Sequence, residues 1–135
     1  NEKEIEEVIQ ESLYKYLLRN QAKYSVEFQD ISTTNLKLKN SGLMTTLYTT
    51  PKEELAKALG VDAVIAGKFK QQMKNKESKS GVLDLTLFDG GTGEWVWKME
   101  EDAGNKHSLI DDTDKLMDNR KEKFANYFHY SLLFR

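Results

Sequence analysis

The sequence predicts an α+β domain in which a mixed or antiparallel sheet of three to four strands packs against helices. Three patterns predict it: a helical periodicity at the N-terminus, strand patterns over residues 61–100, and a second helical pattern near the C-terminus. The 135 residues are enough for one core, and no repeat or linker divides them. We therefore expect a single domain over residues 1–135.

The first helix is expected over roughly residues 2–19. Its inward face is predicted from residues that recur every three or four positions, namely Ile5, Val8, Ile9, Ser12, Leu13, Tyr16 and Leu17. Glutamates in its first two turns suit the positive end of the helix dipole. The alternation of residues 24–28 then predicts a half-buried strand.

Residues 30–50 leave two interpretations open. Residues 30–34 could begin a short helix, whereas residues 35–39 alternate like a strand. Thr50 and Pro51 then predict the start of a helix, with Thr50 as N-cap and proline in the first turn. Gly60 predicts the end of that helix.

The next strands are the most clearly marked. Residues 61–69 are almost continuously apolar, which is typical of a central strand buried on both faces. Residues 82–88 and 94–99 predict a hairpin around the glycine-rich turn 89–93. Trp95 and Trp97 lie two positions apart on its second arm, so we expect them to share a face.

The C-terminal part predicts one long helix that crosses the sheet. Ser108 and Asp111 resemble a capping box, and a seven-residue repeat follows at Ile110, Met117, Phe124 and Ser131. This helix is expected to cover the two tryptophans and place them in the core. The alternative, in which the indoles stack on bases or sugars, stays open.

Composition excludes several function classes. A net charge of −2 gives no basic field for nucleic acid, and no apolar run approaches the length of a membrane span. The absence of cysteine excludes disulfides, thiolate metal sites and cysteine nucleophiles. His107 and His129 are the only histidines and belong to no ligand cluster. We expect no metal and no cofactor.

Neither the glycine-rich turn nor the lysines indicate chemistry. Residues 89–94 lack the lysine and following helix of a phosphate loop and the oxygen ligands of a calcium loop, so Asp89 is expected to bond its own turn. There is no nucleophile elbow or catalytic carboxylate pair, so we predict a protein without enzymatic activity. A lysine cluster is interpreted as a solvated strand end rather than a lipid or nucleic-acid site: Lys68, Lys70, Lys74, Lys76 and Lys79.

One apolar loop is the best candidate for a partner site. Its members are Leu43, Met44, Leu47 and Tyr48, flanked by threonines. If these side chains stay exposed they form a contact surface, and if not they pack over the sheet edge. Both readings stay open.

Residues 59–67 (LGVDAVIAG), with Asp89, the run 92–94 and Trp97, carry a family resemblance. The region 50–100 resembles the periplasmic domain shared by curli-secretion lipoproteins, penicillin-binding-protein activator lipoproteins and the TolB N-terminal domain. The resemblance implies a periplasmic lipoprotein at the outer membrane that acts as an adaptor or assembly factor through an envelope protein partner. Its lipid anchor would lie outside this chain, and a homo-oligomer is compatible with it. The alternative function is a small-ligand or nucleic-acid binding module on the Trp95/Trp97 face.

Overall fold

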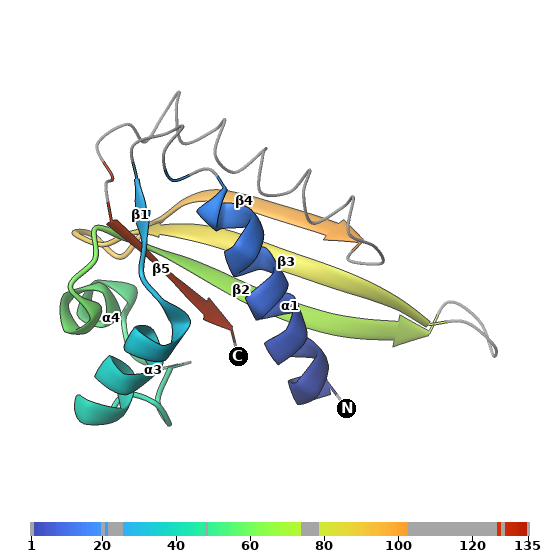
Figure 1. Ribbon diagram of the computed structural model, residues 1–135, viewed down its shortest axis with the longest axis horizontal. Helices are drawn as coiled ribbons and strands as arrows, with labels where there is room; N and C mark the ends of the chain where they lie inside the picture. The colour runs from blue at the N-terminus through green and yellow to red at the C-terminus, as the bar shows by residue number, and fades with distance from the viewer. Residues whose placement is uncertain are drawn as a thin grey trace.

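The computed structural model describes residues 2–19, 21, 26–47, 49–73, 79–102, 127 and 129–134. In these ranges the chain forms helices on both faces of one sheet (Figure 1). The elements in chain order are α1 (Glu2–Leu18), β1 (Glu27–Phe28), α3 (Ile31–Asn40), α4 (Lys52–Leu59), β2 (Ala63–Met73), β3 (Lys79–Asp89), β4 (Trp95–Asp102) and β5 (His129–Phe134).

The described sheet is mixed and has five strands in the order β1-β5-β2-β3-β4. β5 is parallel to both β1 and β2, while β3 is antiparallel to β2 and β4. The α+β class is as predicted, but the expectation of three to four strands and a long C-terminal helix is wrong. Residues 129–134 form a strand between β1 and β2, and residues 103–126 lie outside the described part of the chain.

The sequence pattern predicts a helix at β5 because this strand is buried on both faces and therefore lacks the alternation of a half-buried strand. Tyr130, Ser131, Leu132 and Leu133 are all at most 5% exposed. A strand with parallel neighbours on both sides is a short apolar run, which periodicity cannot separate from a buried helix segment. His129, which we expected inside the final helix, begins this strand.

α1 covers one face of the sheet (Figure 1). Ile9, Leu13 and Leu17 recur every four residues, and all three are buried. Val8 was predicted to share this face but is 64% exposed. The core that α1 closes includes Phe28, Ala63, Ile65, Phe69, Leu83, Leu85, Leu87, Tyr130 and Leu132.

α3 and α4 cover part of the other face. Their cluster contains Leu38, Leu55, Ala56, Leu59, Val64 and Leu133. Each helix ends at a glycine with positive φ, Gly42 at 74° and Gly60 at 70°. After Gly42, the Leu43 amide donates to the Leu38 carbonyl at 2.9 Å, and Val61 follows Gly60 in the same way. These are Schellman motifs, in which the residue after glycine packs back on the helix.

The two helix starts resolve the ambiguous region. Residues 35–39 belong to α3 and not to a strand, and the Asp30 carboxylate caps this helix by accepting from the Thr33 amide at 3.3 Å. Pro51, rather than Thr50, occupies the N-cap position of α4. The Thr50 hydroxyl instead donates to the Thr46 carbonyl at 2.7 Å.

A buried polar junction joins β1, α3 and α4. The Gln29 side-chain Nε2 donates to the Leu59 carbonyl at 2.8 Å, and its Oε1 accepts from the Thr34 hydroxyl at 2.6 Å. Lys37 Nζ donates to the same Leu59 carbonyl at 3.1 Å. Gln29 and Thr34 are buried, so each bond satisfies a group that cannot reach water.

Candidate functional site

The β3–β4 turn is organised around Asp89. Its amide donates to the Glu94 carbonyl at 2.9 Å, and its carbonyl accepts from the Gly93 amide at 2.8 Å. Its carboxylate Oδ2 accepts from the Thr92 amide at 2.9 Å and the Thr92 hydroxyl at 2.8 Å. The prediction that Asp89 bonds the backbone of its own turn is therefore confirmed.

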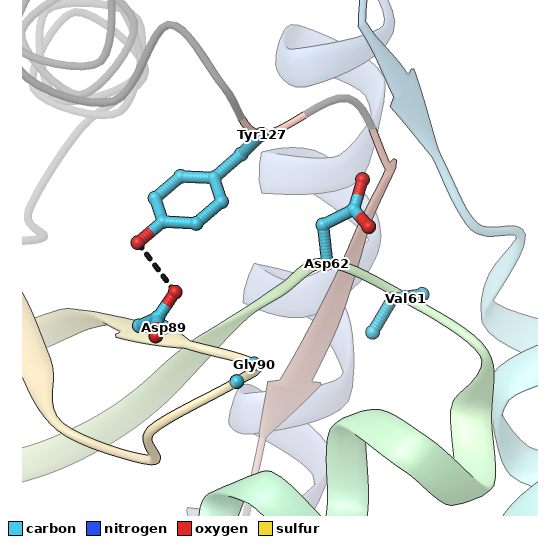
Figure 2. A pocket seen from close by; sticks show the side chains of 6 residues that line it. Val61, Asp62, Asp89, Gly90 and Tyr127 are labelled. Atoms are coloured by element: carbon cyan, nitrogen blue, oxygen red, sulfur yellow. Dashed lines mark hydrogen bonds between the residues drawn. The ribbon is translucent and has the colours of Figure 1, made fainter.

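Asp89 also holds Tyr127, a contact that the sequence did not indicate. The Tyr127 hydroxyl donates to Asp89 Oδ1 at 2.7 Å (Figure 2). This bond and those from Thr92 lower the pKa of Asp89, although partial burial opposes them. Burial, and then the bond to Asp89, raise the pKa of Tyr127. The pair is therefore stable as carboxylate and neutral phenol.

An open hollow of about 400 Å³ lies beside this pair. It is lined by Val61, Asp62, Asp89, Gly90, Gly91 and Tyr127. Gly90 forms its floor by close packing: its amide donates to the Asp62 carbonyl at 2.8 Å, and a Cβ there would overlap that carbonyl. Only glycine fits this position.

The Asp89 carboxylate beside the hollow is already bonded within the fold. The Asp89 carboxylate is occupied by Tyr127 and Thr92. In Figure 2 the Asp62 carboxylate points away from Asp89, so the two acids do not converge. Among the described residues, the Tyr127–Asp89 bond ties the β3–β4 turn to the segment just before β5.

The two tryptophans do not share a face. The ladder pairs Leu87 with Trp97 but Phe88 with Trp95, because a β-bulge adds one residue between them. Leu87 belongs to the α1 core, whereas Phe88 packs on the α3–α4 cluster. Directly opposite residues share a face, so the bulge turns the indoles to opposite sides.

The burial of the two rings differs accordingly. Trp97 is half-buried against the α1 core, but Trp95 is 56% exposed, so the prediction of two buried indoles is wrong for Trp95. Lys98 Nζ lies 4.3 Å from the Trp95 ring centroid, in a cation–π contact. The rings cannot form one stacking platform, which the ligand-binding alternative required.

In the predicted partner loop (residues 43–48), some apolar side chains pack on the protein and one is exposed. Leu43 and Leu47 are half-buried against the α3–α4 cluster, and Met44 is 41% exposed. Tyr48 lies outside the described residues. The sequence reasoning missed Leu36, which is 58% exposed on α3. Leu36 and Leu38 lie about 200° apart around a helix, so Leu38 is inside and Leu36 outside.

The remaining sequence candidates are only partly described. Lys68 is half-buried on β2, directly opposite Asp84 on β3. Lys74, Lys76 and His107 lie outside the described residues. Lys70 belongs to β2 and Lys79 to β3. Lys68 and Asp84 are directly opposite charges of opposite sign, which is a favourable cross-strand arrangement.

In the ranges given above, no helix has the length and apolarity to cross a bilayer. Comparison of the chain with protein-family models, with curated proteins and with solved structures gave no match.

Proposed function

We propose that this protein is a non-enzymatic adaptor or assembly factor of the bacterial periplasm that works through protein–protein contacts. In this proposal a lipid outside the present chain anchors it to the outer membrane, as the resemblance over residues 50–100 implies. The observation that carries the contact role is the exposure of apolar side chains on and after α3, 58% for Leu36 and 41% for Met44.

These side chains stand on a rigid support. α3 is closed at its start by the Asp30 cap and at its end by the Gly42 motif. Leu43 and Leu47, which flank Met44 in the sequence, pack on the α3–α4 cluster. We name Leu36, Leu43, Met44 and Leu47 the α3 surface. A rigid apolar surface loses little entropy on binding, which favours its use as a docking site.

The local charge indicates the chemistry of the partner. Residues 31–52 contain three lysines (Lys37, Lys39 and Lys52) and no acidic residue, although the whole chain carries −2. Lys37 Nζ donates to the Leu59 carbonyl at the end of α4. Lys39 is exposed on the same helix as Leu36. The complementary partner surface would be apolar with an acidic rim.

Site-specific photocrosslinking tests the contact role. A photoreactive amino acid at position 44 should give a discrete crosslinked protein in cells of the native organism. The control is position 8, because Val8 is also exposed but lies on α1. The same product from both positions, or none from position 44, would remove the α3 surface from consideration.

Fractionation tests the location. The full-length protein should separate with the outer membrane and shift to the lipid phase in detergent extraction. Recovery with the cytosolic proteins would overturn the envelope assignment.

A further inference from the structure

The outer edge of β4 has no neighbour among the described strands. An edge strand presents unpaired N–H and C=O groups that can bind another strand. The bulge lies at its first residues, Trp95 to Trp97, and leaves the rest of the strand in regular register with β3. The regular part carries four charged residues, Lys98, Glu100, Glu101 and Asp102. Lys98 and Glu100 are the two whose side chains are described, and both are exposed.

The ladder determines which groups point outward. The Asp89 N–H donates to the Glu94 carbonyl, so the backbone N–H and C=O groups of Asp89 point toward β4. Because this direction alternates along a strand, the backbone groups of Leu87 and Leu85 also point toward β4. Met99 is opposite one of these residues, so its own groups face β3. Lys98 and Glu100 therefore direct theirs outward, and their side chains lie on the face opposite α1.

We infer that β4 pairs antiparallel with β4 of a second copy of this chain, about a two-fold axis at Met99. This register places each Lys98 opposite Glu100 of the other copy, in two hydrogen-bonded pairs of opposite charge. An axis at Lys98 or at Glu100 would place like charges opposite each other instead. The charge order thus selects one register.

In the ladder, Asp84 lies between Lys68 on β2 and Glu100 on β4, so the lysine is opposite Asp84 and not opposite Glu100. Glu100 and Asp84 are directly opposite like charges, which is an unfavourable pair. In the described part of the chain, Lys98 contacts the Trp95 ring and forms no ion pair. A second copy would place Lys98 directly opposite Glu100, on the side away from Asp84. The α3 surface is not used, so this inference does not depend on the proposed function.

Charge exchange tests the pairing. Sedimentation equilibrium of the wild-type chain should show a reversible dimer. Lys98→Glu or Glu100→Lys should each raise the dimer dissociation constant about tenfold or more, because two repulsive pairs replace two attractive ones. The double exchange restores both pairs and should recover wild-type dimerisation. A monomeric wild type, or a double exchange no better than the single ones, would overturn the inference.

Crosslinking tests the axis. The chain has no cysteine, so Met99→Cys introduces the sole thiol. At a two-fold axis this residue meets its own copy, and mild oxidation should give a disulfide-linked dimer. Glu100→Cys is the matched control, since it would face Lys98 and should stay unlinked. Equal linking by both variants, or linking by Glu100→Cys alone, would contradict the register.

Discussion

The two faces of the sheet differ in how far they are covered. On the α1 face, burial continues along β3 through Leu83, Leu85 and Leu87, each fully buried. On the other face, the alternating residues of the same strand, Asp84 and Thr86, are only half-buried. There the apolar cluster is confined to the region under α3 and α4.

The difference shows that one strand can bury one set of its side chains completely and leave the other set partly exposed. Alternation with a period of two separates the sets. Their coverage is decided by helices that come from elsewhere in the chain. Substitutions at buried positions should therefore lower the unfolding free energy more than matched substitutions at partly exposed positions.

The largest effect is expected from Leu85→Ala. This residue is fully buried in the core cluster to which α1 contributes, so its truncation leaves a cavity and should cost about 2–5 kcal/mol of unfolding free energy. Thr86→Ala, one residue away on the open face, should change it by less than about 0.5 kcal/mol. Urea unfolding measures both, and equal losses would contradict the distinction between the faces.

Gly90→Ala should be the next most damaging change. Its Cβ would overlap the Asp62 carbonyl, and forced repacking should cost about 2–3 kcal/mol. Gly91→Ala is the control, because a Cβ there would meet the Asp89 carboxylate at 3.5 Å, an ordinary van der Waals distance. Thermal unfolding should therefore separate two adjacent glycines, and matched melting temperatures would refute the packing argument.

Thr34→Val tests the buried polar junction. Loss of the hydroxyl leaves Gln29 Oε1 buried without its donor, which should cost about 1–2 kcal/mol. Ser131→Ala is the contrast, because the Ser131 hydroxyl is buried without a partner in the described chain. Its removal should be neutral or stabilising. A destabilising Ser131→Ala, measured by chemical unfolding, would show that this hydroxyl is bonded.

Tyr127→Phe should have the smallest effect, about 1 kcal/mol, because the bond to Asp89 is only partly buried. The lowered pKa of Asp89 means that its contribution is present above the ordinary value of 3.8 and is lost as pH falls through the folded value. The raised pKa of Tyr127 means that its contribution is present below 10.0 and is lost as pH rises above it.

Unfolding of wild type and Tyr127→Phe over a pH series checks this window. The difference in unfolding free energy should be constant between the two ordinary values and shrink outside them. A difference that does not change with pH would show that Tyr127 stabilises by packing alone.

The sequence predicted best the elements that carry local signals. Gly60 ends α4, residues 61–69 form most of the central β2, and Asp89 organises its turn, because each depends on neighbouring residues. For residues 35–39 the sequence left strand and helix open, because alternation over five residues fits a strand as well as one side of a short helix. A strand would have placed Leu36 and Leu38 on one face, whereas the helix α3 separates them.

Three features could not be predicted because they depend on distant contacts. The bulge that separates Trp95 from Trp97 is a property of pairing with β3. β5 (His129–Phe134) is a strand that pairs with β1 and β2, both distant from it in the sequence. Tyr127 reaches Asp89 across 38 positions of sequence. No local pattern reports any of these contacts.

Partner capture by matched variants tests the central claim most directly. Leu36→Ser with Met44→Ser should abolish capture of the crosslinked envelope protein, while Val8→Ser should retain it. Both variants should melt within a few degrees of wild type, because only exposed side chains change. Undiminished capture by the double variant, at unchanged stability, would contradict the account.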